Sequence, residues 1–433
     1  MISVSGIRGI YGDGLDERCA EKFAYSFGKR VGGSVVVGRD SRISGPAIAQ
    51  AVITGLRKAG AQVVDIGLAS TPTTEMAVTK TNASGGIIIT ASHNPREWNG
   101  LKMLGSDGVF IDAEEGAEVI KVYESIDTLD GFPLTGSLKT WVKADGHHID
   151  SILALTLIDR SLIENSVFTV CIDTVNGAGG PICGSLLKRL GCIVHSLNIE
   201  PTGEFAHTPE PVPAHIGDLC NFVSEKKADV GFAVDPDVDR LSIVSDEGIA
   251  VGEEYTLALV ADYIMNRSRK PSACNLSTSR MIDDAAARYG LTVHRSPVGE
   301  INVVEAMRIS GACIGGEGNG GIILPELHYG RDAILGMALV LQMMAEKNAS
   351  MSELVGTLPR YSMIKEKMPV ANKGMWIEPV KAAFEGEEID ERDGIKVIFP
   401  KSWIHVRESN TEPVVRIIAE TPTEEETRAL IIN

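Results

Sequence analysis

Short apolar runs and longer amphipathic runs alternate along most of this chain, and the alternation repeats in the same order three times. In the first stretch, strand-like runs at residues 34–37, 62–66 and 87–89 are separated by helical patterns at 46–58 and 74–80. Parallel strands need a crossover connection, which is usually a helix, so this order is typical of a mostly parallel sheet. The chain is therefore predicted to be an α/β protein.

The βαβαβ order recurs twice more, as a repeat of topology without residue identity. The second stretch has strands and helices at 168–173, 180–190, 192–197, 216–227 and 229–234. The third has them at 274–277, 281–289, 291–295, 302–309 and 312–315. Three similar units are therefore expected.

From about residue 362 the pattern changes. Polar and apolar residues alternate at 395–399 and 403–407, which indicates half-buried antiparallel strands of a smaller α+β domain. A chain of 433 residues with 44% hydrophobic content is also too long for one core. The predicted fold is three similar βαβαβ domains with mixed sheets plus this C-terminal domain, all four around one central cleft. The predicted division is 1–135, 150–248, 249–355 and 362–433.

Charge and cysteine content exclude several classes of protein. The chain has 41 basic and 58 acidic residues, a net charge of −17, whereas nucleic-acid binding requires a basic surface. Its seven cysteines form no Cys-x-x-Cys pair, as expected for reduced thiols in the cytosol. The sequence opens without a basic and apolar leader, and its longest apolar helical stretch, 333–344, is too short to cross a bilayer. We therefore predict a cytoplasmic protein that binds neither nucleic acid nor membranes.

Polar loops follow the last strand of each repeat. They read Thr-Ala-Ser-His-Asn-Pro at 90–95, Asp-Pro-Asp-Val-Asp-Arg at 235–240 and Gly-Glu-Gly-Asn-Gly-Gly at 316–321. Ligands and catalytic groups gather at the carboxyl ends of parallel strands. Three equivalent strand ends thus offer a hydroxyl, a cluster of carboxylates and a glycine-rich loop, and one shared cleft is the simplest account.

Ser92, in the first of these loops, is interpreted as the residue that carries a phosphoryl group. A serine hydroxyl is a poor nucleophile at neutral pH and needs a general base, a metal ion or nearby positive charge. His93 and Lys102 are close in sequence, whereas metal ligands would have to come from elsewhere. The alternative is that Ser92 only caps a helix or shapes a turn, which is the common role of such a serine.

Three aspartates in the second loop are the most specific chemical signal. Asp235, Asp237 and Asp239 alternate after an apolar strand, so a tight loop can turn their oxygens toward one point. Hard cations such as Mg²⁺ prefer oxygen ligands of this kind. An EF-hand is excluded because its sixth position, a glycine, is Arg240 here. Two alternatives stay open: a solvated acidic turn, and a haloacid-dehalogenase-like phosphatase with one aspartate as nucleophile.

The run Arg-Glu-Ser-Asn-Thr-Glu-Pro at 407–413, followed by Arg416, is suited to phosphate binding. Guanidinium groups match phosphate oxygens in pairs, and hydroxyls, an amide and loop N–H groups add further donors. The alternative is a solvated strand face with basic residues. A site shared with Ser92 requires the last domain to close over the cleft.

In these motifs the chain resembles the α-D-phosphohexomutase family of phosphoglucomutases, phosphomannomutases and phosphoglucosamine mutases. The resemblance covers essentially the whole chain, and the matching runs lie at 5–9, 38–40, 90–95, 99–102, 235–240, 316–320 and 407–413. It implies that Ser92 is a phosphoserine. It also implies that Asp235, Asp237 and Asp239 hold one Mg²⁺ together with a phosphoserine oxygen.

The resemblance further implies a reaction between hexose 6-phosphate and hexose 1-phosphate. Phosphoserine gives its phosphoryl group to the sugar, the resulting hexose 1,6-bisphosphate turns end over end, and its other phosphate returns to the serine; the same bisphosphate is the expected activator. Charge neutralisation by Mg²⁺ and Arg8 accounts for much of such catalysis. Lys102 is the implied proton-transfer residue and His93 a further catalytic candidate. The implied substrate-binding residues are Arg240, Glu317, Asn319, Arg407, Ser409, Asn410, Thr411 and Arg416.

The third loop departs from the form Gly-Glu-x-Ser-Gly-His that many relatives carry, because it has no histidine. Together with the run Tyr-Gly-Arg-Asp-Ala at 329–333, it looks most like phosphoglucosamine mutases and archaeal-type phosphomannomutases. Phosphoglucosamine mutase is therefore the favoured activity, with phosphomannomutase or phosphoglucomutase as the alternative. A metal-dependent sugar phosphatase and a non-catalytic sugar-phosphate-binding protein are the hypotheses from other classes. A monomer or a homodimer is expected.

Overall fold

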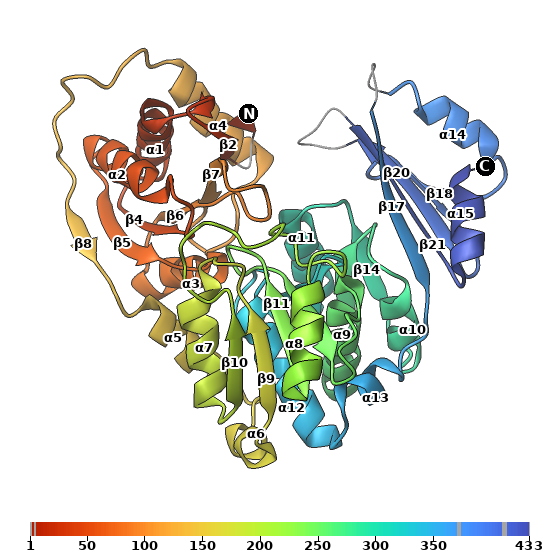
Figure 1. The fold of residues 1–433 in the computed structure, drawn as a ribbon. Coiled ribbons are helices and arrows are strands. Elements are labelled where there is room, and N and C mark those ends of the chain that lie inside the picture. Colours follow the sequence, from red (N-terminus) through yellow and green to blue (C-terminus); the bar gives the residue numbers. More distant parts are fainter. Residues whose placement is uncertain (1, 4–5, 370–373, 409–413, 433) are drawn as a thin grey trace. The chain divides into compact units, whose positions relative to one another are not determined.

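A computed structural model of the protein describes residues 2–3, 6–369, 374–408 and 414–432. The chain forms two units, one of Met1–Thr256 and Gly320–Leu354, the other of Leu257–Asn319 and Val355–Asn433. Figure 1 follows the chain through both units by colour. Within the described part of the chain, no helix is long and apolar enough to cross a membrane.

The largest sheet lies in the first unit, in the order β1-β2-β7-β6-β4-β5-β8, with β3 paired to β2. Its strands are β1 (Ile2–Ser3), β2 (Gly6–Tyr11), β3 (Gly14–Leu15), β4 (Ser34–Arg39), β5 (Gln62–Leu68), β6 (Gly85–Ile89), β7 (Trp98–Leu104) and β8 (Leu138–Thr140). Strands β4, β5, β6 and β8 pair in parallel, as the alternation of helices and strands predicts. Strand β7 returns directly from the loop after β6 and is antiparallel to it.

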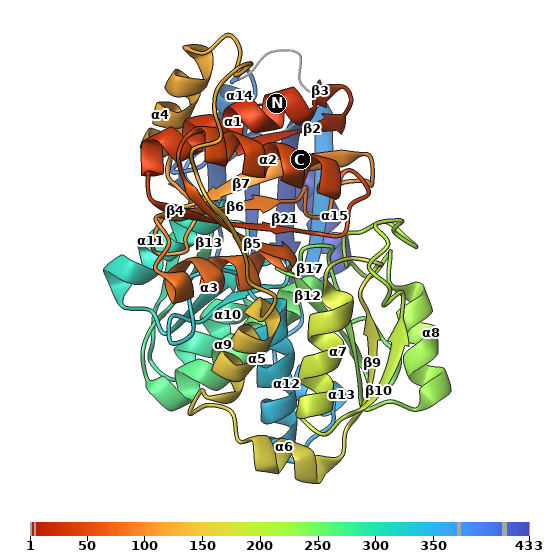
Figure 2. The same cartoon turned by 90° about the vertical axis from the view of Figure 1, so that its left-hand side faces the viewer.

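Helices cover both faces of this sheet (Figure 2). Val35 and Val37 of β4 pack in a cluster with Phe23 of α1 (Glu17–Val31) and with residues of α2 (Gly45–Lys58), whereas Val36 packs with Val78 of α3 (Thr71–Thr81). Helix α3 starts earlier than the predicted 74–80, because the Ser70 side chain accepts the N–H of Thr73 and a proline occupies the first turn. Helix α4 (Ala113–Glu124) packs beside α1.

The second sheet of this unit has the order β10-β9-β11-β12. Its elements are β9 (Thr169–Asp173), α7 (Gly179–Arg189), β10 (Ile193–Leu197), α8 (Gly217–Lys226), β11 (Val230–Val234) and β12 (Leu241–Ser245). The first three strands are parallel, and β12 again returns antiparallel from the loop after β11. Helices α5 (Ala144–Leu153), α6 (Arg160–Ser166), α12 (Ala333–Lys347) and α13 (Met351–Val355) and strand β16 (Gly321–Ile323) complete the described unit.

The second unit combines a parallel sheet with an antiparallel one. Strands β13 (Ser272–Asn275), β14 (Val293–Ser296) and β15 (Ile314–Glu317) are parallel, and α9 (Glu253–Ser268), α10 (Met281–Ala287) and α11 (Glu300–Ser310) accompany them. The antiparallel sheet has the order β17-β21-β20-β19-β18. Its elements are β17 (Ser362–Pro369), α14 (Ile377–Ala383), β18 (Glu388–Asp390), β19 (Ile395–Ile398), β20 (Trp403–Glu408), β21 (Val414–Thr421) and α15 (Glu424–Ile432).

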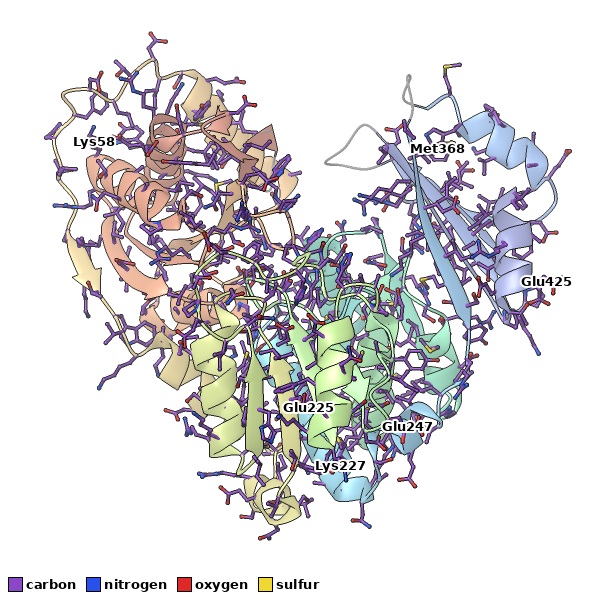
Figure 3. The ribbon with its side chains drawn as sticks, viewed as in Figure 1. Lys58, Glu225, Lys227, Glu247, Met368 and Glu425 are labelled. Atoms are coloured by element: carbon purple, nitrogen blue, oxygen red, sulfur yellow. The ribbon has the colours of Figure 1, made fainter. Side chains whose placement is uncertain are left out.

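The predicted fold class is confirmed: mixed α/β sheets are followed by a C-terminal antiparallel sheet with helices. The antiparallel return strands β7 and β12 are among the elements that the βαβαβ pattern alone did not show. Charged side chains such as Glu225, Lys227 and Glu247 point into solvent (Figure 3), while apolar side chains fill the layers between helices and sheets.

Candidate active site

Ser92 lies in the turn that connects β6 to β7. Its φ of 49° is in the left-handed region, which costs a non-glycine residue about 1 kcal/mol or more, and its side chain is only 4% exposed. The backbone N–H donates to Thr90 Oγ1 at 2.9 Å, and the Ser92 hydroxyl donates to Asp235 Oδ2 at 2.9 Å. The turn therefore aims a buried hydroxyl at the aspartate loop of the second sheet.

Arg42 holds this turn in place. Its guanidinium is completely buried and donates to the carbonyl oxygens of four residues of the turn, at 2.5 to 2.8 Å: Ser92, Asn94, Pro95 and Trp98. Its Nε donates to Asp40 Oδ2 at 3.0 Å, and the same carboxylate oxygen accepts the hydroxyl of Thr90 at 2.7 Å. All five N–H donors of the guanidinium are thus used.

The aspartate loop follows β11 and is fully buried at Asp235, Asp237 and Asp239. The backbone N–H groups of Asp239 and Arg240 donate to Asp235 Oδ1 at 3.1 and 3.2 Å. Val238, a β-branched residue, takes a φ of 64°, a strained conformation that closes the tight turn. The alternating spacing seen in the sequence therefore does bring the three carboxylates to one place.

These carboxylates fit a divalent cation. One oxygen of each lies within 4.8 Å of the others, and Oδ1 of Asp237 and Oδ1 of Asp239 are buried without a hydrogen bond. Burial raises the pKa of Asp235 well above its usual value, and the negative charges of Asp239 and Asp237 raise it further. Three buried carboxylates that converge on one point are the oxygen donor set that Mg²⁺ prefers.

Lys102 supplies positive charge from β7. Its Nζ lies 2.8 Å from Asp237 Oδ2 and 3.7 Å from Asp239 Oδ2. Burial acts to lower the pKa of Lys102, but the two carboxylates outweigh it and raise that pKa above its usual value. Burial likewise acts to raise the pKa of Asp237, but Lys102 and the hydroxyl of Thr71, at 2.7 Å, hold it below its usual value. Lys102 is therefore positively charged at neutral pH.

Two further arginines line the same region. Arg8 on β2 donates to Asn94 Oδ1 at 2.8 Å, and burial lowers its pKa. Arg240 Nη1 donates to Glu210 Oε1 at 3.0 Å, while its Nε lies 3.8 Å from Asp239 Oδ1. The two guanidinium groups thus bring positive charge to the region where the Ser92 turn meets the aspartate loop.

His93 is neutral in this setting. Its Nδ1 lies 3.4 Å from Ser92 Oγ and its Nε2 lies 3.9 Å from Glu210 Oε1. Burial, with the charges of Arg240 and Arg8, lowers the pKa of His93 well below its usual value. A neutral imidazole beside the serine hydroxyl can hydrogen-bond to it. The positive charges of the site are therefore carried by Lys102 and the arginines.

Sequence reasoning did not assign a role to three residues of this site: Arg42, Thr71 and Arg331. Arg331 Nη2 donates to Asp239 Oδ2 at 2.6 Å, and the next residue, Asp332, caps α12 and so fixes its position. The Tyr-Gly-Arg-Asp-Ala run at 329–333, which resembles that of family members, could have identified Arg331 as a site residue. Nothing in the sequence indicates that Arg42 is buried beneath the turn.

The second unit holds the other predicted groups. Glu317 ends β15, where its Oε1 accepts from Asn275 Nδ2 at 2.8 Å and from the backbone N–H of Gly299 at 3.2 Å. Arg407 donates through Nε to Asp393 Oδ2 at 3.1 Å and is paired across the sheet with Arg416. Asn319 lies in the loop after Glu317. Ser409, Asn410 and Thr411 are outside the described residues, and the roles of this group stay predictions.

Family models for phosphoglucomutase/phosphomannomutase match successive parts of the chain. Alpha/beta/alpha domain I matches residues 2–130, domain II 147–248, domain III 253–361 and the C-terminal domain 363–431. A phosphoglucomutase/phosphomannomutase of Thermococcus kodakarensis is 35% identical over 99% of this chain and 96% of its own length. The chain belongs to the phosphoglucomutase/phosphomannomutase family. As the family resemblance implied, it is an isomerase, a phosphohexomutase.

Other members of the family match over nearly their whole length. A probable phosphoglucosamine mutase of Methanopyrus kandleri is 34% identical over 98% of this chain and 95% of its own. The crystal structure of a phosphoglucomutase/phosphomannomutase family protein from Burkholderia thailandensis is 27% identical, with a TM-score of 0.85 over 99% of this chain and 96% of that one. The relatives thus agree on the family while their names differ on the sugar.

Proposed function

We propose that this phosphohexomutase interconverts hexose 6-phosphate and hexose 1-phosphate through a phosphorylated Ser92, with glucosamine phosphate as its preferred substrate. The observation that carries the proposal is the hydrogen bond from the Ser92 hydroxyl to Asp235 Oδ2, at 2.9 Å across a sequence separation of 143 residues. It joins a strained, buried serine to three buried carboxylates, which is a suitable arrangement for phosphoryl transfer.

The proposed reaction has two transfers. In the first, the Ser92 Oγ–P bond breaks, the phosphoryl group bonds to the free hydroxyl of the hexose monophosphate, and the proton of that hydroxyl passes to Ser92 Oγ. The bisphosphate then turns end over end, and in the second transfer its other phosphoryl group returns to Ser92 Oγ while a proton moves back to the departing sugar oxygen. Lys102, charged and held by Asp237 at 2.8 Å, is the donor that can protonate the sugar oxygen as it leaves.

Asp235, Asp237 and Asp239, with an oxygen of phosphoserine, are the residues that would hold one Mg²⁺. When bound, the ion neutralises charge on the transferring group. Arg8 and Arg240 contribute to the same neutralisation from the protein side. Hexose 1,6-bisphosphate is the proposed activator, because it phosphorylates any chain that has lost the group from Ser92.

The choice of sugar rests on Glu317 and on the relatives. A carboxylate held by Asn275 and by the backbone N–H of Gly299 can accept hydrogen bonds from sugar hydroxyls or from a protonated 2-amino group. A 2-amino group would suit its charge, and several relatives are named probable phosphoglucosamine mutase. The second candidate, phosphoglucomutase/phosphomannomutase activity, is favoured by the name of the Thermococcus kodakarensis relative.

The remaining parts of the proposal concern residues and setting. The substrate phosphate is assigned to Arg407, Ser409, Asn410, Thr411 and Arg416, and the sugar to Arg240, Glu317 and Asn319. The domain division at 1–135, 150–248, 249–355 and 362–433, the shared cleft, a cytoplasmic location and a monomeric or homodimeric state belong to the same proposal.

The test is interconversion of the 6- and 1-phosphates of glucosamine, mannose and glucose, with Mg²⁺ and a trace of the matching bisphosphate. We expect a preference for glucosamine phosphate and a loss of several orders of magnitude in kcat for Ser92→Ala. Ser106→Ala, at an exposed turn of the same sheet, is the matched control and should retain wild-type kcat. Release of inorganic phosphate without isomerisation would instead make the protein a phosphatase, and preference for mannose or glucose would favour the second candidate.

A further inference from the structure

A second cluster of metal-ligating side chains is buried in the first unit, apart from the aspartate loop. Helix α5 supplies His148, the loop before α12 supplies His328, and the residue that caps α12 is Asp332. Helix α5 packs against both α3 and α12 (Figure 2). One ligand atom of each of the three side chains lies within 4.8 Å of the others. His148 and Asp332 are fully buried and His328 is nearly so.

The two carboxylate oxygens of Asp332 have different hydrogen-bond partners. Oδ1 accepts the backbone N–H groups of Ile334 and Leu335 at the start of α12, at 2.8 and 3.0 Å. Oδ2 faces the two rings, 2.8 Å from His148 Nε2 and 3.2 Å from His328 Nε2. One carboxylate oxygen and two imidazole nitrogens therefore converge on one point, while the helix cap fixes the carboxylate.

The opposite edge of each ring carries the outer partner that metal-binding histidines usually have. His148 Nδ1 lies 2.9 Å from Thr73 Oγ1. His328 Nδ1 lies 3.4 Å from Glu75 Oε2. Glu75 is 1% exposed, and neither of its carboxylate oxygens has a hydrogen bond. Burial raises the pKa of Glu75 and the facing ring of His328 lowers it, so an N–H on His328 Nδ1 is a natural partner for this buried carboxyl group.

We propose that His148, His328 and Asp332 form a second metal site, which takes a borderline transition ion such as Zn²⁺ through two nitrogens and one oxygen, with water as fourth ligand. Imidazole nitrogen suits Zn²⁺, whereas the all-oxygen aspartate loop suits Mg²⁺. Ligand atoms around tetrahedral zinc are about 3.4 Å apart, so the contacts to Asp332 Oδ2 must widen by about half an ångström or less. Metal binding would stabilise the packing of α5 and α12, which carry ligands, against α3, which carries the outer partners Thr73 and Glu75. This proposal does not depend on which sugar phosphate is the substrate.

Metal binding requires that the proton leaves Nε2 of each ring. Without metal, His328 Nε2–H donates to Asp332 at 3.2 Å; burial acts to lower the pKa of His328, but the carboxylates of Asp332 and Glu75 outweigh it and raise that pKa to about 10. With metal on its Nε2 lone pair, His328 releases this proton to solvent and keeps the one on Nδ1, which faces Glu75. On His148 the remaining proton lies on Nδ1 and donates to Thr73 Oγ1.

Cobalt titration of the full chain tests this site. Wild-type protein is stripped with a chelator, excess Mg²⁺ is restored to occupy the aspartate loop, and Co²⁺ is added while visible absorption is recorded. We expect one equivalent of Co²⁺ per chain with the intense bands of a tetrahedral site, and competition by Zn²⁺. His148→Gln and His328→Gln should weaken this binding tenfold or more. His147→Gln is the matched control. His147 precedes His148 on α5, but its ring lies against Trp141, so this variant should bind Co²⁺ as wild type does.

Glu75→Gln keeps the shape of the outer partner but removes its charge, and should weaken Co²⁺ binding about 10- to 100-fold. The wild-type titration and this variant decide the question even if the histidine variants do not fold. The proposal is overturned if wild-type protein shows no tetrahedral bands. It is equally overturned if the bands persist in folded His148→Gln and His328→Gln, or are lost in Asp235→Asn, which would place the ion in the aspartate loop.

Discussion

Replacing Arg42 by lysine should damage both stability and the transfer step. The guanidinium uses five N–H donors on five acceptors, whereas an ammonium group has three. At least two buried oxygens therefore lose their donor, at about 1–3 kcal/mol each, so Arg42→Lys should lower the free energy of unfolding by about 2–6 kcal/mol. Arg42→Ala also leaves Asp40 as an unpaired buried charge and should cost still more.

The effect on catalysis follows from what Arg42 holds. Four of its hydrogen bonds end on the turn that carries Ser92, so a lysine leaves that turn free to shift by an ångström or so. A displacement of this size costs about 100-fold in rate, and it should appear in kcat while KM for the hexose phosphate changes little. The rate at which bisphosphate phosphorylates Ser92, followed by intact mass, should fall by a similar factor.

Arg39→Lys is the matched control. Arg39 ends β4, three residues before Arg42, and makes a single hydrogen bond, to the backbone carbonyl of Asp40 at 3.0 Å. The kcat and stability of Arg39→Lys should therefore stay close to wild type. Thermal unfolding and steady-state kinetics are measured on all three proteins, with kinetics at a temperature where each is folded. The reasoning is refuted if folded Arg42→Lys phosphorylates Ser92 at the wild-type rate, or if Arg39→Lys loses as much.

Three further predictions concern a proton donor, a titrating core histidine and a helix contact. Lys102→Met should lower kcat about 100- to 10,000-fold at saturating Mg²⁺, because the charged donor beside the carboxylates is lost; unchanged kcat would rule out its role. Burial lowers the pKa of His405 to about 4, so the unfolded chain binds a proton between about pH 6.5 and 4 that the native chain does not. Stability should therefore fall by up to about 3 kcal/mol as pH drops through that window, and urea unfolding of His405→Gln should lack this component. Gly180→Ala on α7 should destabilise the fold by several kcal/mol, because the new Cβ would lie 1.8 Å from the carbonyl oxygen of Ile199. Gly184→Ala on the same helix places its Cβ 3.6 Å from Ile199 Cδ1, an ordinary contact, and should stabilise the fold by up to about 1 kcal/mol. Equal unfolding temperatures for the two variants would contradict this prediction.

The sequence by itself determined the order of elements and the ends of the strands. Periodicity is a local property, so alternating runs such as 34–37 and 46–58 predict a parallel sheet without knowledge of their partners. Polar loops after apolar strands likewise indicated where Ser92 and the three aspartates lie. Those loops carried the resemblance to the family, which the comparisons confirm.

Only the tertiary structure decided which groups meet and what charge they hold. The contacts of Ser92 with Asp235 and of Lys102 with Asp237 join residues 143 and 135 positions apart, and no local pattern encodes such a distance. From the sequence, Arg42 would be expected at the surface, whereas in the structure it is buried and donates to four carbonyl oxygens. Charge states depend on burial and on the sum of neighbouring charges, and both exist only once the sheets have packed.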